Sequence, residues 1–78
     1  MYELNELYRY LVGAPCDCSL GVLLKETEEE LEFWDLNYKM KVIWKKDNLP
    51  SYFIKANKLE DYEEKKYKEW LTQQHTEQ

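Results

Sequence analysis

The chain has 78 residues, of which 16 are acidic and 11 are basic, so its formal net charge is −5 at pH 7. A chain of this length has room for one small core, and its negative charge disfavours unspecific binding to DNA or to anionic membranes. It also holds three Trp, seven Tyr and two Phe. So small a core cannot easily bury that many rings, and some are expected at the surface.

Apolar residues in the first segment recur with helical spacing, at Leu4, Leu7, Tyr8 and Leu11. This spacing predicts an amphipathic helix over residues 2–12, which Gly13 ends. Residues 16–19 are expected to form a loop, which leads into a short turn of helix over residues 20–25.

The middle of the chain carries the signals of a helix start and a helix end. Thr27 followed by Glu30 matches a capping box, and further acidic residues surround it. Lysines gather near the end of the segment, at Lys39, Lys41, Lys45 and Lys46. This distribution of charge suits a helix dipole and predicts a helix over residues 28–46.

The same segment also has the period of a strand, which leaves a second interpretation open. Apolar residues occupy every second position, at Trp34, Leu36, Tyr38, Met40, Val42 and Trp44. Such alternation is typical of a half-buried strand. No Asn-Gly or Asp-Gly turn lies between residues 20 and 46, so the helix is favoured over the strand.

A turn over residues 47–51 precedes the last predicted helix, at residues 52–72. The sequence therefore predicts a mainly α fold, a small bundle of about three helices in one compact domain over residues 1–72. The alternative is an α+β fold with a central antiparallel hairpin around residues 20–46, flanked by helices. Residues 73–78 are expected to form a frayed tail.

The residues that carry chemistry do not form a catalytic or metal-binding pattern. The one histidine, His75, lies in the predicted tail, and two glycines cannot make a phosphate-binding loop. Cys16 and Cys18 are two ligands where a structural zinc site needs four. We therefore expect no enzyme, no cofactor and no bound metal. No long apolar run or export signal is present, so a cytoplasmic location is expected.

Surface aromatic and acidic residues are the candidate partner-binding residues. Trp and Tyr anchor many protein interfaces; the candidates are Tyr38, Trp44 and Tyr52, whereas Trp34 and Trp70 are expected in the core. Two acidic runs complete the candidates: Glu28, Glu29, Glu30 and Glu32, then Glu60, Asp61, Glu63 and Glu64.

The leading functional hypothesis is a small noncatalytic adaptor, assembly factor or inhibitor that binds another protein. Ten Lys against one Arg and the short length suit a phage- or plasmid-encoded accessory protein. The partner is expected to offer a basic or aromatic-accepting surface, and self-association through a second apolar face is a further expectation. The alternative is an inhibitor whose two acidic runs together imitate DNA. Nucleic acid and membranes are not expected as partners, and binding of single strands by the middle lysines ranks last.

Overall fold

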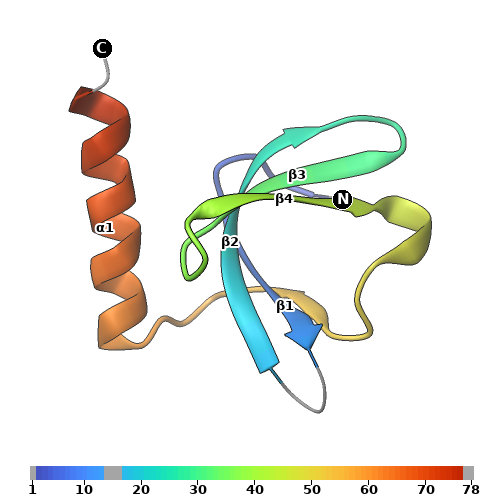
Figure 1. The fold of residues 1–78 in the computed structure, drawn as a ribbon, viewed down its shortest axis with the longest axis horizontal. Coiled ribbons are helices and arrows are strands. Elements are labelled where there is room, and N and C mark those ends of the chain that lie inside the picture. Colours follow the sequence, from blue (N-terminus) through green and yellow to red (C-terminus); the bar gives the residue numbers. More distant parts are fainter. Residues whose placement is uncertain (1, 14–16, 77–78) are drawn as a thin grey trace.

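In the part of the chain that the structure describes, five antiparallel strands form one sheet, and an α-helix follows them in sequence (Figure 1). The computed structural model describes residues 2–13 and 17–76, with side chains as far as Gln73. The elements are β1 Leu7–Gly13, β2 Asp17–Glu26, β3 Glu30–Asp35, β4 Met40–Lys45, the short 3-10 helix η1 Lys46–Asn48, β5 Phe53–Lys55 and α1 Asp61–Thr76.

The sheet has the strand order β4-β3-β2-β1-β5 and is strongly curled. Neighbouring strands lie about 4.8 Å apart, so β4 and β1 would be roughly 14 Å apart in a flat sheet. The ring centroids of Trp44 on β4 and Tyr10 on β1 are nevertheless only 5.6 Å apart. Phe33 on β3 and Phe53 on β5 also lie close, at 5.8 Å. The curl therefore brings the two ends of the sheet to one shared core.

Aromatic rings fill the concave face of the sheet. The buried residues there are Tyr8, Tyr10, Leu23, Leu31 and Phe33, and Tyr2, Val12, Trp44, Leu49 and Phe53 pack around them. Gly21 lies beneath the ring of Tyr10, where an added Cβ would come within 2.5 Å of the Tyr10 hydroxyl oxygen. A glycine at this position is required because any side chain would displace the central ring of the core.

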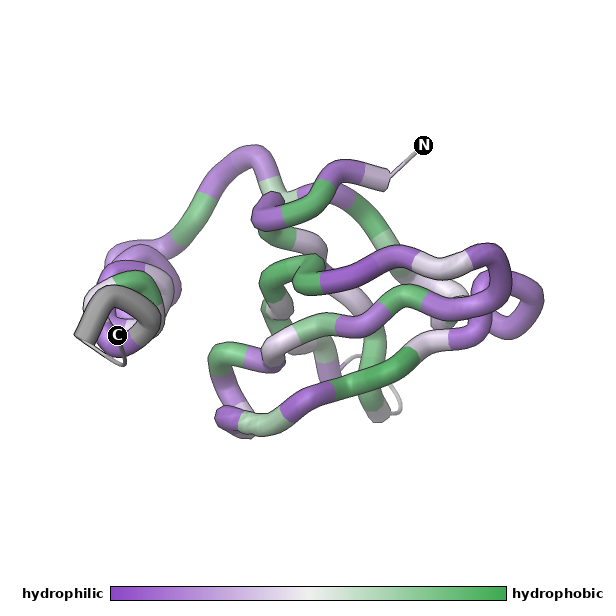
Figure 2. The backbone as a smooth tube through the Cα atoms, turned by 90° about the horizontal axis from the view of Figure 1, so that it is seen from above, coloured by the Kyte–Doolittle hydropathy of each residue, from purple (hydrophilic) through white to green (hydrophobic). Residues whose placement is uncertain are grey.

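A second apolar layer lies on the convex face, between the sheet and α1. It contains the buried residues Leu7, Leu20, Val22, Leu36 and Trp70, with Leu24, Trp34, Ala56, Leu59, Tyr67 and Leu71 packed against them. Figure 2 shows α1 standing beside the sheet and connected to it by one extended segment. Strands β1 and β2 are therefore covered on both faces. Of the two tryptophans expected in the core, Trp70 is buried in this layer, and Trp34 is partly buried and packs against it.

The helix predicted over residues 2–12 is wrong, because this segment contains β1. Tyr8 and Tyr10 point to the concave core, whereas Leu7 belongs to the convex layer. A strand that is covered on both faces carries apolar residues at consecutive positions, which hides the alternation of a strand. The helical turn predicted over residues 20–25 is likewise wrong, since those residues lie in β2.

The helix predicted over residues 28–46 is also wrong, and with it the mainly α fold of about three helices. The segment forms β3 and β4, joined by a turn over residues 36–39. The strand alternative comes closer, although three strands and not one hairpin occupy residues 20–46, and the element before them is a strand. The contact expected of a capping box does form, since the Glu30 N–H donates to Thr27 Oγ1 at 3.0 Å. It closes the turn between β2 and β3 instead of starting a helix.

The last predicted helix, over residues 52–72, is correct only in its second part. Its start is taken by β5, which pairs with β1, and α1 begins at Asp61. At the other end α1 continues to Thr76, into the segment predicted as a frayed tail. Glu77 and Gln78, which complete that tail, lie outside the described residues, as does the side chain of His75.

Candidate functional site

A buried carboxylate, Asp35, organises the turn between β3 and β4. Its Oδ1 accepts hydrogen bonds from the Asn37 and Tyr38 N–H groups at 2.9 and 2.8 Å and from the Ser19 hydroxyl at 2.8 Å. Its Oδ2 accepts one from the Tyr10 hydroxyl at 2.8 Å. Burial and this hydrogen bond raise the pKa of Tyr10, so the hydroxyl stays protonated as a donor. The network holds the turn that presents Tyr38.

A second buried carboxylate, Glu63, fastens α1 to the convex face of the sheet. It accepts two hydrogen bonds from the guanidinium of Arg9 on β1, at 2.5 and 3.1 Å. It also accepts the Glu60 N–H at 2.9 Å, which caps the first turn of the helix. The ion pair with Arg9 lowers the pKa of Glu63. Both buried carboxylates are thus engaged in contacts that support the fold.

The pKa of Glu63 is lower in the folded chain than its ordinary value, so this residue makes the free energy of unfolding depend on pH. Its folded-state pKa lies below the ordinary value of 4.5, so its contribution is complete above that value and is lost as the pH falls through the folded-state pKa. We expect Glu63→Gln to lower the free energy of unfolding at pH 7, and the gap from wild type to narrow below about pH 4.5. Urea titrations from pH 3 to 7 measure this; a gap that stays constant with pH would contradict it.

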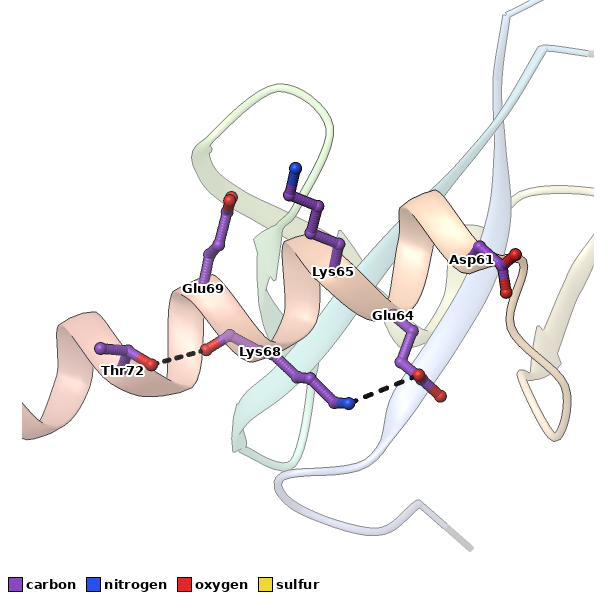
Figure 3. Close-up of a pocket in the computed structure, with 6 residues that line it drawn as sticks. All are labelled: Asp61, Glu64, Lys65, Lys68, Glu69 and Thr72. Carbon is purple, nitrogen blue, oxygen red and sulfur yellow. Dashed lines mark hydrogen bonds and ion pairs between the residues drawn. The ribbon is translucent and has the colours of Figure 1, made fainter.

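The face of α1 that points away from the sheet is polar (Figure 3). Its residues are Asp61, Glu64, Lys65, Lys68, Glu69 and Thr72. Glu64 and Lys68 form an ion pair at 3.5 Å, one turn apart. All six side chains come from one helix and all are exposed, so this face is a solvated helix surface and not a cleft.

A small hollow lies between the C-terminal half of α1 and the sheet. It is lined by Trp34, Leu36, Lys39, Lys66, Glu69, Trp70 and Gln73. Lys66 donates a hydrogen bond to the side-chain oxygen of Asn37 at 2.8 Å, and Asn37 donates to the Ser19 hydroxyl at 3.1 Å. These contacts join α1 to the turn over residues 36–39.

Within the described residues, no three His, Cys, Asp or Glu side chains gather as metal ligands. Cys18 lies exposed on β2. Its predicted companion Cys16 lies outside the described residues.

Strand β4 and the turn before it expose apolar side chains. Tyr38, Met40 and Ile43 are each 54% exposed, and no residue of β4 is fully buried. Three lysines lie among them, Lys39, Lys41 and Lys45. These six residues, which lie in the turn and on both faces of the outermost strand, are called the β4 surface below. The Tyr38 hydroxyl donates to Asp17 at 3.4 Å, and the charge of that carboxylate raises the pKa of Tyr38.

Another set of exposed apolar residues surrounds Arg9, on the convex face. Ile54 lies opposite Arg9 on β5, and Tyr52 precedes it on the same face. Tyr62, in the first turn of α1, is close enough to interact electrostatically with Arg9, as is Tyr52. Tyr52, Ile54 and Tyr62 are 42, 46 and 59% exposed. They are called the Arg9 patch.

The three aromatic residues predicted to bind a partner do not form one surface. Tyr38 belongs to the β4 surface and Tyr52 to the Arg9 patch, whereas Trp44 packs against Tyr10 in the concave core. Sequence reasoning did not select Met40, Ile43, Ile54 or Tyr62. The signal that could have found the first two was present, since both lie in a segment with strand alternation that has apolar residues on both faces.

The two acidic runs lie at opposite ends of the molecule (Figure 1). Glu28 and Glu29 are exposed in the turn between β2 and β3. Glu30 and Glu32 form ion pairs with Lys45 and Lys41, at 3.9 and 3.6 Å.

The second run belongs to the first turn of α1 and the residue before it. Glu60 and Asp61 are exposed, Glu63 is buried against Arg9, and Glu64 pairs with Lys68. The two runs therefore do not join into one extended negative surface.

Comparisons of the chain with protein-family models, curated proteins and solved structures found no match. In the described part of the chain, no helix combines the length and the apolar character that crossing a bilayer requires. The fold defines a class, a curled antiparallel sheet with one helix on its convex face, and the exposed β4 surface is its candidate site.

Proposed function

We propose that this chain is a noncatalytic, cytoplasmic protein-binding domain and that it binds its partner through the β4 surface. One observation carries the proposal: an entire strand of the sheet has no buried residue although four of its six residues are apolar. Exposed apolar side chains that are grouped on one element are typical of an interaction site, whereas single ones are common everywhere.

The chemistry of the β4 surface supports a protein as the partner. Tyr38, Met40 and Ile43 offer apolar contact area, and aromatic residues and Met are enriched in interfaces between proteins. The turn that carries Tyr38 is held by two main-chain hydrogen bonds to Asp35 Oδ1, which also accepts one from the Ser19 hydroxyl on β2. A surface that is already ordered loses less conformational entropy when it binds.

The two alternatives draw less support from the arrangement of charges. Imitation of DNA requires a continuous row of acidic groups, and the two acidic runs are separated by the width of the sheet (Figure 1). A nucleic-acid strand is bound along a continuous positively charged groove. Lys41, Lys45 and Lys46 each stand beside a carboxylate, of Glu32, Glu30 and Glu26, so negative groups interrupt the positive charge here.

The test compares two sets of substitutions in the full chain. Proteins captured by the wild type from a lysate of the source cell are identified, and the leading candidate is purified and titrated directly. The variant Tyr38→Ser/Met40→Ser/Ile43→Ser should weaken this binding at least about tenfold. The matched control, Ile54→Ser/Tyr62→Ser, removes equally exposed residues from the Arg9 patch and should bind as the wild type does.

Thermal unfolding must first show that both variants keep the fold. Unchanged affinity in the triple variant would refute the β4 surface as the binding site. If only the control variant loses affinity, the binding site is the Arg9 patch and not the β4 surface. Salt is expected to weaken the binding without abolishing it, because apolar contacts are not screened by ions.

A further inference from the structure

We propose that the partner adds a strand to the free edge of β4, using an extended segment in which acidic residues lie opposite Lys41 and Lys45 and aliphatic residues fill the other positions. This inference rests on the proposed function, since it specifies how the β4 surface binds and what it selects.

The main chain of β4 has an edge without a partner. β4 is the outermost strand of the sheet, and within the described residues only β3 pairs with it. The Lys46 N–H donates a hydrogen bond to the Glu29 carbonyl at 2.8 Å. Residues 29 and 46 continue the β3–β4 pairing, so this bond marks residue 46 as a position that is hydrogen-bonded toward β3. In an antiparallel pair, hydrogen-bonded positions alternate. Residues 40, 42 and 44 therefore bond to β3, and the N–H and C=O groups of residues 41, 43 and 45 point away from it.

The side chains of the same three residues form one row on the convex face. Ile43 lies at its centre, between Lys41 and Lys45, whose side chains are each 65% exposed. On the β3 side this row meets Glu32 and Glu30, at 3.6 and 3.9 Å. A strand added on the other side would face the same lysines, and carboxylates opposite them would complete the ion pairs across three strands.

The concave face of β4 favours apolar side chains in the added strand. Met40 is exposed there, and Val42 and Trp44 are only partly buried. The added strand places every second side chain on this face. Its pattern is therefore acidic, aliphatic, acidic on the convex face, with aliphatic residues between these positions. Pockets or faces that accept alternate side chains are how strand addition becomes selective.

Charge argues against a second copy of this chain as the occupant. Two β4 strands that paired antiparallel around Ile43 would place Lys41 of each copy opposite Lys45 of the other. Like charges directly across a strand pair are destabilising. Lysines on an edge strand are a common protection against such pairing, and here they leave the edge open to a segment of opposite charge.

The probe is a short fluorescent peptide with Glu opposite Lys41 and Lys45 and Val at the remaining positions, titrated into the full chain by anisotropy. The expected result is saturable binding. A peptide of the same composition with its two Glu placed side by side is the control and should bind at least about tenfold more weakly. Lys41→Glu/Lys45→Glu should reject the first peptide and bind one in which Lys replaces both Glu.

Two further measurements separate strand addition from side-chain contact alone. Ile43→Pro removes an N–H that points away from β3, so it should abolish binding while the sheet stays folded. In the wild type, saturating peptide should slow amide exchange at residues 41, 43 and 45 at least about tenfold and leave residues 40, 42 and 44 unchanged. No peptide binding, or no change in exchange at these amides, would overturn the inference.

Binding measurements with the natural partner distinguish strand addition from the proposed function as a whole. If Tyr38→Ser/Met40→Ser/Ile43→Ser weakens its binding but Ile43→Pro and the two lysine reversals do not, the β4 surface binds by side chains and strand addition is refuted. If none of these variants affects the partner, the proposed function itself fails.

Discussion

Replacing Asp35 with alanine is expected to lower the free energy of unfolding by about 3–5 kcal/mol. The carboxylate accepts four hydrogen bonds, two from the main chain of the turn over residues 36–39 and two from the hydroxyls of Tyr10 and Ser19. Both hydroxyl-bearing residues are buried, so the substitution leaves donors that water cannot reach. Removing one member of a buried polar network leaves the other members buried without partners, so the loss in stability exceeds the stability that the network contributed when it formed.

Urea denaturation followed by circular dichroism measures this loss. Asp47→Ala is the matched control, because Asp47 is exposed in η1 and its removal should change the free energy of unfolding by less than about 0.5 kcal/mol. A loss below about 1 kcal/mol for Asp35→Ala would show that the turn is held by other contacts.

Removing the indole of Trp70 is expected to cost about 3 kcal/mol and to loosen α1 from the sheet. Trp70 is buried in the convex layer and stacks against Tyr67, with ring centroids 6.2 Å apart. Trp34 belongs to the same layer, so Trp70→Ala should also expose its ring to water. The remaining tryptophan fluorescence should then shift to longer wavelength.

The measurement combines urea denaturation with the emission spectrum of the folded variant. Tyr62→Ala, on the same helix, is the control, since Tyr62 is exposed and its loss should cost less than about 0.5 kcal/mol. Equal effects of the two substitutions would mean that α1 is not fixed to the sheet through Trp70.

The sequence allowed the second part of the C-terminal helix to be predicted, but not the sheet. The segregation of acidic and basic residues in the middle segment was interpreted as a helix dipole. In the structure it reflects pairing across strands, Glu30 with Lys45 and Glu32 with Lys41. A hairpin places the start of one strand beside the end of the next, so the two arrangements produce the same order of charges along the chain.

The turn between β3 and β4 also lacks, at its left-handed position, the glycine or asparagine that usually indicates a hairpin in a sequence. The turn between β3 and β4 has its left-handed residue at Lys39, with φ of 56°, where glycine or asparagine is typical. The buried Asp35 compensates by accepting hydrogen bonds from the turn's main chain. That stabilisation depends on Ser19 and Tyr10, which come from other strands, and cannot be found by inspecting the turn sequence alone.

The candidate residues were predicted in part, for a similar reason. Tyr38 and Tyr52 are exposed as expected, whereas Trp44 turns inward because the sheet curls enough to bring it against Tyr10. Curvature is a property of the whole sheet. Alternation along β4 could indicate two faces, but it could not tell which of them the rest of the chain would cover.

The strand order also has a consequence for how the chain folds. Strands β1 to β4 form a meander in which each strand pairs with the next one in sequence, whereas β5 must return across the meander to pair with β1. Pairings between sequence neighbours lose little entropy on loop closure and form early, and distant ones form late. During synthesis the four-strand meander can therefore assemble first, and its aromatic core stays partly open until Phe53 arrives.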